Sequence, residues 1–154
     1  YLVRGKVPAP WHLDITGAIS TRAVDLSAQE DARQYSWNAD GQFAVKGPVV
    51  DLTKALDAGA SLLIDWRVDQ PANGPVLVSF GEATFNLRAE ASSKPAGTIL
   101  KTQVPLRCFR DAGTKFGAVG SPLRIKAPKG FVATIRNVRI EGSGGNGPCP
   151  VATK

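Results

Sequence analysis

Cysteine is the most nucleophilic side chain in this sequence, and two are present. Cys108 lies in the stretch VPLRCFRDAG, where alternating apolar residues predict a strand over residues 98–108 with the cysteine in the core. A thiol buried among apolar groups has a raised pKa and is inert. We favour a disulfide with Cys149, 41 positions later, which an exported protein could form and which would be worth about 4 kcal/mol. Neither alternative makes Cys108 a catalytic nucleophile.

The remaining acid–base groups do not form a catalytic set. His12 is the one histidine, so a triad or a Cys–His pair would have to be built around it, and we expect a surface or packing role instead. Glu30 and Asp31 are adjacent, so on a strand they face opposite sides and cannot flank one bond. Asp65 and Asp69 are expected on a solvated strand face. The sequence therefore predicts no catalytic residue.

Ligand sets for metals and nucleotides are also missing from the sequence. Two cysteines and one histidine do not supply the clustered ligands of a zinc site. The 16 glycines fall at predicted turns rather than in a phosphate-binding motif. We therefore expect neither a metal nor a nucleotide cofactor.

The charge distribution argues against a nucleic-acid partner. The net charge is +6, with −2 over residues 1–80 and +8 over residues 81–154. In the second half the charges alternate with apolar residues, as in LRIKAP and IRNVRI, which is typical of the solvated face of a strand rather than of a compact basic patch. No apolar run is long enough for a membrane helix, so we expect no membrane partner.

The elements that must position these residues are strands. Turn residues recur every eight to twelve positions between short alternating segments, which predicts an all-β sandwich with antiparallel sheets. A hairpin is expected where VLVSF and ATFNLR flank Gly81 and Glu82, and a short helix over residues 51–60. The apolar alternation changes phase between Ile135 and Val138, which predicts a β-bulge near Arg136–Asn137.

Three regions follow from these patterns. Residues 1–10 contain RGKVPAP and resemble a linker from a preceding domain. Residues 11–141 form the β-sandwich, and Trp11 at its start is expected to pack against a neighbouring domain. Residues 142–154 form a glycine-rich tail, expected to be loose except where Cys149 anchors it.

Five segments occur in an order that is similar to a known family: PAPWHLDITG, AQEDARQYSW, LLIDWRV, VPLRCF and ATIRNVRI. Together they resemble the C-terminal module of bacterial glycoside hydrolase family three enzymes, in particular exo-acting β-glucan glucohydrolases and β-glucosidases. The resemblance covers residues 8–140. It implies a galactose-binding-like jelly roll appended to the two catalytic domains of a periplasmic or extracellular enzyme. It also implies that both catalytic carboxylates lie on those other domains, so Asp65 in the IDW segment carries no catalysis. A structural calcium is compatible with such a fold, but no aspartate cluster identifies its ligands.

The resemblance raises the question of where a sugar would bind. Tyr35 and Trp37 share a predicted strand face with Asp31 and Arg33, and a face that mixes aromatic and charged residues is expected to be exposed. These four residues, with Asn38 nearby, are the predicted β-glucan contacts. The alternative is that Trp37 fills the core and Tyr35 caps its edge, while Trp66 is predicted to be core.

The sequence therefore favours a non-catalytic accessory domain of an exported β-glucan hydrolase. Such a domain would support the catalytic domains of the same polypeptide and could contact β-glucan. The alternatives are a free-standing carbohydrate-binding module and a structural interaction domain without sugar affinity.

Overall fold

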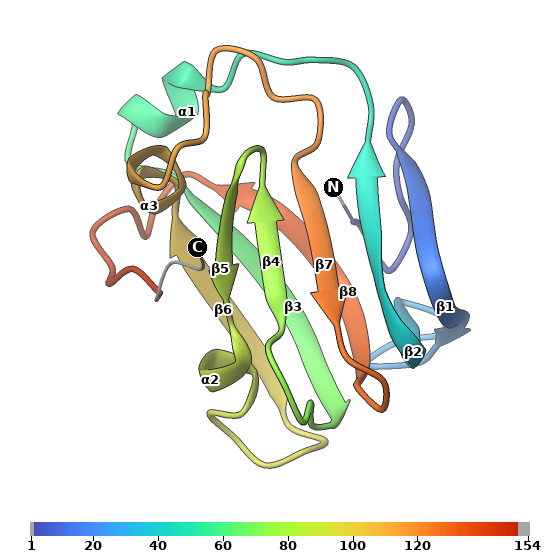
Figure 1. Cartoon of the computed structure of the whole chain (residues 1–154). Coiled ribbons are helices and arrows are strands. Elements are labelled where there is room, and N and C mark those ends of the chain that lie inside the picture. The colour runs from blue at the N-terminus through green and yellow to red at the C-terminus, as the bar shows by residue number, and fades with distance from the viewer. Residues whose placement is uncertain (1, 151–154) are drawn as a thin grey trace.

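The structure is a computed structural model that describes residues 2–150. Strands dominate it, and three short helices lie at the ends of the strands (Figure 1). No helix in the described part of the chain is long and apolar enough to cross a membrane. The elements are β1 (His12–Val24), β2 (Ala32–Lys46), α1 (Thr53–Asp57), β3 (Ser61–Gln70), β4 (Leu77–Phe80), β5 (Ala83–Asn86), α2 (Arg88–Ala91), β6 (Ile99–Pro105), α3 (Leu106–Asp111), β7 (Leu123–Ala127) and β8 (Val132–Glu141).

All strands belong to one antiparallel hydrogen-bonded sheet in the order β5-β4-β7-β2-β8-β3-β6, with β1 beside β2. The sheet curls into two layers, because β2 pairs with β8 through residues 33–36 and with β7 through residues 41–45. We call β5, β4 and β7 the β4 layer, and β8, β3 and β6 the β3 layer; the first lies in front of the second in Figure 1. The predicted all-β architecture with antiparallel strands is confirmed.

The bend in β2 depends on two glycines. Gly17 of β1 faces Gly41 of β2, and the register shifts beside them. A Cβ at Gly41 would lie 2.7 Å from the carbonyl oxygen of Thr16, and Gly17 has a φ of +97° that other residues rarely adopt. Glycine at both positions therefore lets β1 follow β2 as it passes from one layer to the other.

Aromatic side chains fill the space between the layers. The ring of Phe131 lies 5.2 Å from that of Trp37 and 6.4 Å from that of Trp66. Trp66 is fully buried, and its indole N–H donates to the Thr102 hydroxyl at 2.9 Å. The prediction of Trp66 as core is confirmed. A second cluster comprises Phe80, Phe85, Phe109 and Phe116, where α3 closes one end of the sandwich.

Three local predictions are confirmed. β4 and β5 form the predicted hairpin, with Phe80 paired to Ala83. The predicted helix is present as α1, and the carboxylate of Asp51 accepts a hydrogen bond from the Thr53 N–H at 2.9 Å. Asp65 pairs with Asn137 and Trp66 with Ile135, so Arg136 is the extra residue of a bulge.

The strand predicted over residues 98–108 is shorter than expected. β6 ends at Pro105, and the chain continues as α3. Leu106, Cys108 and Phe109 are all buried, a spacing that fits one helical turn and not the alternation of a strand. Cys108 is therefore a core residue as predicted, but it lies on a helix.

Asp65 was expected on a solvated face, and this prediction is wrong. Its side chain is 5% exposed because β3 is flanked by β8 and β6 and because the bulge directs Arg136 over it. The Arg136 Nε donates to Asp65 Oδ2 at 2.8 Å, and its Nη1 lies 3.8 Å from Asp31 Oδ2. Coupling mainly to Asp65 raises the pKa of Arg136 further above its ordinary value. The bulge thus forms a partly buried ion-pair cluster.

Residues 2–6, expected to lie in a linker, are part of the fold. Leu2 is fully buried and exchanges two backbone hydrogen bonds with Val138 on β8, at 3.1 and 2.9 Å. The N–H of Gly5 donates to the carbonyl of Arg136 at 2.8 Å. That a domain precedes this segment stays a prediction.

Candidate functional site

The two aromatic residues predicted to contact sugar lie in the core. Tyr35 and Trp37 are 0% and 2% exposed. The Tyr35 ring stacks on Phe43 with centroids 4.4 Å apart, and the Trp37 indole N–H donates to the carbonyl of Gly41 at 2.9 Å. The prediction of an exposed aromatic platform is therefore wrong. The face that carries these residues turns inward because β2 packs beneath the opposite layer.

The other predicted contacts do not converge. Asp31 is buried and accepts hydrogen bonds from the N–H groups of Leu26 and Ser27, at 2.7 and 3.1 Å. Burial raises the pKa of Asp31, but these backbone hydrogen bonds outweigh it and hold the pKa below its ordinary value. Arg33 donates to the Thr21 hydroxyl, and Asn38, which is exposed, donates to the Ser20 hydroxyl. Asp31 therefore closes the loop between β1 and β2, and the five residues do not come together in one exposed site.

A groove on the outer face of the β4 layer is a better candidate. Cross-strand pairing aligns Thr16 of β1, Gln42 of β2, Lys126 of β7 and Leu77 of β4 in one row. Two hollows that share Asp40 and Lys126 lie along this row, and we call the pair the Lys126 groove. Three strand spacings make the row about 14 Å long. The lining residues are Thr16, Gly17, Asp40, Gly41, Gln42, Pro75, Leu77, Lys126, Ala127 and Pro128.

The Lys126 groove combines free polar groups with an apolar floor. The side chains of Thr16, Gln42 and Lys126 make no hydrogen bond to any residue that the structure describes. Pro75 and Leu77 supply the apolar surface. Ligand sites commonly combine apolar surface with a few unpaired polar groups in this way. Alternation in GQFAVK and LRIKA places Gln42 and Lys126 on outward faces, but it does not show that the two strands are neighbours.

The polar face of the β3 layer has a structural role instead. Asp69 accepts hydrogen bonds from Gln34, Arg67 and Thr134, which come from three neighbouring strands. Burial raises the pKa of Asp69, but the three hydrogen bonds and the Arg67 charge outweigh it, so the pKa lies below its ordinary value. Because these groups satisfy one another, this network ties β2, β8 and β3 together.

Trp11, the predicted interdomain contact, lies half-buried against the sandwich. A Cβ at Gly47 would come within 2.3 Å of its indole ring, so the ring packs directly on the backbone there. Its role toward another domain stays a prediction.

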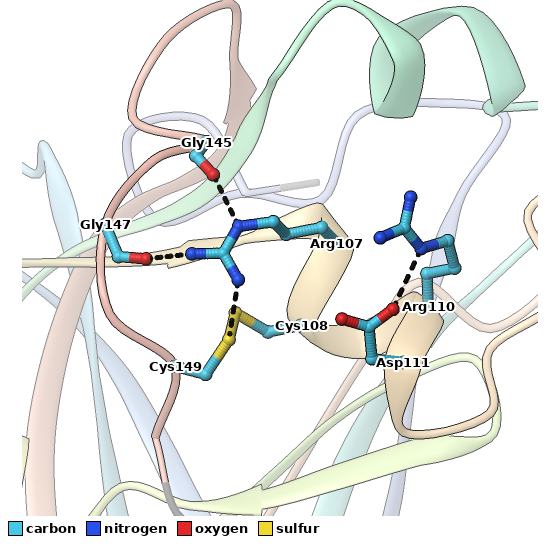
Figure 2. The surroundings of a disulfide bond; sticks show 7 residues. All are labelled: Arg107, Cys108, Arg110, Asp111, Gly145, Gly147 and Cys149. Carbon is cyan, nitrogen blue, oxygen red and sulfur yellow. Dashed lines mark hydrogen bonds and ion pairs between the residues drawn. A yellow bond between two sulfur atoms is a disulfide. The ribbon is translucent and has the colours of Figure 1, made fainter.

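The glycine-rich tail, predicted to be loose except where Cys149 anchors it, is held in place by contacts at residues 143–149, and the predicted disulfide is present. Cys149 forms a disulfide with Cys108, and Figure 2 shows Arg107 beside this bond. The Arg107 guanidinium donates to the carbonyls of Gly145 (2.8 Å) and Gly147 and to the Cys149 Sγ (3.3 Å). Ser61 also donates to the carbonyl of Ser143 at 2.6 Å. These contacts pin the glycine-rich segment to the start of β3 and to α3.

The described residues contain no group of three or more His, Cys, Asp or Glu side chains that could hold a metal ion. The carboxylates of Asp31 and Asp65 both face Arg136, a cation, and not a space for a metal ion. A structural calcium stays without identified ligands.

Comparisons with known proteins place the fold. The Exop_C family model, described as galactose-binding domain-like, matches residues 9–140. The chain belongs to this family. The Exop_C domain described here is similar to the extra C-terminal domain (X) of the exo-1,3/1,4-β-glucanase ExoP from a Pseudoalteromonas species, with a TM-score of 0.72 and 16% identity over 93% of this chain and 91% of that one. No curated protein matched the sequence.

Two further structures show the same fold. In a crystal structure of the ExoP exo-1,3/1,4-β-glucanase the match covers 91% of this chain and 20% of that chain, again with a TM-score of 0.72. A family 11 carbohydrate-binding module from Clostridium thermocellum, in complex with a β-1,3-1,4-mixed-linked tetrasaccharide, matches with a TM-score of 0.59 and 12% identity over 92% of this chain and 94% of that one. The resemblance expected from the sequence is confirmed at the level of family and fold.

Proposed function

We propose that this Exop_C domain is a non-catalytic accessory domain of an exported, exo-acting β-glucan hydrolase, where it supports the catalytic domains of the same polypeptide. The similar ExoP domain is one fifth of its enzyme, which supports a role beside catalytic domains. The Cys108–Cys149 disulfide supports a periplasmic or extracellular location, because disulfides persist in oxidising compartments.

The acid–base groups of the described residues support a non-catalytic role. Asp31 and Asp65 both face the Arg136 guanidinium, so they are paired with a cation rather than with a bond to be cleaved. Both cysteines are consumed in the disulfide, and His12 is exposed on β1. The Thr134 hydroxyl does donate to the Asp69 carboxylate, but Thr134 is fully buried and Gln34 and Arg67 also bond this carboxylate, so the pair is structural.

The observation that carries the proposal is the burial of aromatic surface. Among the described residues, every aromatic side chain except the half-buried Trp11 is less than 5% exposed. A free-standing carbohydrate-binding module needs an exposed ring on which a pyranose can stack, since stacking supplies much of the apolar contact. The domain is therefore suited to act as part of a larger enzyme rather than as an independent binder.

The Lys126 groove supports a weak contact with β-glucan as a finer proposal. Gln42 and Lys126 supply hydrogen-bond donors for sugar hydroxyls, and Leu77 and Pro75 supply a surface for the C–H face of a ring. Hydrogen bonds to neutral hydroxyls exchange with water and contribute only about 1 kcal/mol each. Affinity from this groove alone is therefore expected in the millimolar range, about 4 kcal/mol.

Affinity electrophoresis tests this function. The chain is run through gels that contain laminarin, mixed-linkage β-glucan or xylan, with the double variant Gln42→Ala/Lys126→Ala and the control Lys101→Ala, an exposed lysine on β6. We expect slight retardation by a β-glucan that the double variant abolishes and the control retains. Strong retardation that survives the double variant would identify a free-standing binder with another site.

A truncation tests the supporting role separately. The hydrolase from the same gene is purified with and without residues 1–154, and the melting temperature of the catalytic part is compared. The proposal predicts a lower melting temperature after truncation. Equal melting temperatures and equal activity would leave no supporting role.

A further inference from the structure

A second pocket lies between residues 5–7, β1 and β2, away from the Lys126 groove. It is lined by Gly5, Lys6, Val7, Leu13, Arg33 and Tyr35. Two cationic side chains and one phenol line it, and no acidic residue does. The residues come from three separate stretches of the chain that the fold brings together.

One wall of this pocket is fixed by a tight turn. The N–H and C=O groups of Val3 and Lys6 pair with each other at 2.9 and 3.0 Å. Gly5 inside the turn has a φ of +77°, and a Cβ there would lie 2.5 Å from the backbone of Ala32. Only glycine fits so close an approach, so the turn holds Lys6 in one position beside β2.

The hydroxyl of Tyr35 is unpaired. Its oxygen is buried, and it makes no hydrogen bond to any residue that the structure describes. Buried hydroxyls nearly always have a partner, because an unmade hydrogen bond costs free energy. Burial raises the pKa of Tyr35 to about 12 despite the opposing charge of Arg33, so at neutral pH the hydroxyl remains a donor.

Arg33 and Lys6 also have hydrogen-bond donors without a partner among the described residues. Arg33 donates to the Thr21 hydroxyl through Nε at 3.0 Å and Nη2 at 2.7 Å, while Nη1 makes no hydrogen bond within the described chain. Lys6 is exposed, and its ammonium group likewise has no partner among the described residues. The Thr21 contact fixes the direction of the Arg33 guanidinium and leaves its Nη1 donors available to a ligand. The pocket thus presents donors and no competing acceptor carboxylate.

We propose that this pocket binds a carboxylate group, with a uronic acid as the ligand that also uses its apolar wall. An ionised carboxylate is acceptor-only and has two oxygens, which match the donors from Tyr35, Arg33 and Lys6. Val7 and Leu13 supply apolar surface for the C–H groups of the sugar ring. The same chemistry would also accept a glutamate side chain from a neighbouring domain, so the test has one arm for each source.

The binding test is an NMR titration of the whole chain with three probes: glucuronate, glucose and a glutamate blocked at its α-amino and α-carboxyl groups. We expect saturable shifts of the amide signals of residues 5–7 and 33–35 with glucuronate and none with glucose. Binding of the blocked glutamate at least as tight as that of glucuronate would identify a protein carboxylate as the natural source. Absence of saturable shifts with both carboxylates, or equal shifts with glucose, would overturn the proposal.

Variants separate the role of each donor. Tyr35→Phe keeps the ring that stacks on Phe43 and removes the hydroxyl, so glucuronate affinity is expected to fall about tenfold or more. Because the hydroxyl is unpaired in the free protein, the melting temperature of this variant should stay equal or rise. Lys6→Ala, at an exposed position, is expected to weaken binding several-fold, and Lys101→Ala to leave it unchanged. Full affinity in Tyr35→Phe, or a lower melting temperature with unchanged affinity, would show a purely structural hydroxyl.

Discussion

Removal of the Cys108–Cys149 disulfide gives the most direct test of how the tail stabilises this domain. The bond joins residues 41 positions apart, and the chain-entropy model gives about 4 kcal/mol for a loop of that length. For a domain of about 150 residues, each kcal/mol shifts the melting temperature by about 2–4 °C. Cys149→Ala should therefore lower it by about 8–16 °C. The variant leaves the Cys108 thiol in its buried position on α3.

The assays are thermal unfolding and urea unfolding, both followed by circular dichroism, with wild type measured with and without dithiothreitol. Reduced wild type and Cys149→Ala should unfold at the same urea concentration, well below that of oxidised wild type. Arg107→Met is the matched control, because it removes the hydrogen bonds to the tail carbonyls but keeps the disulfide. This variant should lower the free energy of unfolding by about 1–2 kcal/mol, and its urea midpoint should still fall when the disulfide is reduced. The reasoning is refuted if unfolded, unreduced wild type has two reactive thiols, or if reductant leaves the midpoint unchanged.

Three further predictions concern single side chains. Arg136→Met leaves the buried carboxylate of Asp65 without its cation and should cost about 3–5 kcal/mol in urea unfolding, whereas Arg139→Met, in an exposed ion pair on the same strand, should cost less than about 1 kcal/mol. Trp37→Ala should destabilise by about 3–5 kcal/mol, yet the folded fraction should migrate through glucan gels as wild type does, because this side chain is in the core; a selective loss of retardation would contradict its assignment. The pKa of Asp69 is lower in the folded chain than its ordinary value of 3.8, so its stabilisation is complete above that value and disappears as the pH falls through the folded pKa. Asp69→Asn should therefore be less stable than wild type at neutral pH, and the difference should shrink in acid; a constant difference down to about pH 2 would contradict this.

Local features were predictable from the sequence because they depend on neighbours in the chain. The phase change between Ile135 and Val138 identified the bulge at Arg136, since alternation has a fixed period of two. The Gly81–Glu82 pair between two alternating segments identified the hairpin for a similar reason. α3 was missed because Leu106 and Cys108, two positions apart, continue the alternation of β6, whereas Leu106 and Phe109, three positions apart, share a face only in a helix.

The candidate groove depended on strand order. Gln42 and Lys126 lie 84 positions apart in the sequence, and they meet because β2 pairs with β7. A pattern within either strand shows which residues face outward, but it carries no information about the strand that lies beside it. The carboxylate pocket has the same origin, because the pairing of Leu2 with Val138 on β8 places residues 5–7 beside Tyr35.

By itself, the sequence determined the all-β class, the turns, the bulge and the separation of each strand into two faces. Tertiary structure decided which of those faces is buried. Arg33, Tyr35 and Trp37 share a face, as alternation requires, but β2 turns that face toward the core. The two aromatic side chains predicted to bind sugar are therefore core residues. Asp65 is buried because Arg136, which lies 71 positions away in the sequence, covers its side chain. Whether a side chain is buried depends on contacts from segments that are distant in the sequence. The alternation within one strand carries no information about those contacts.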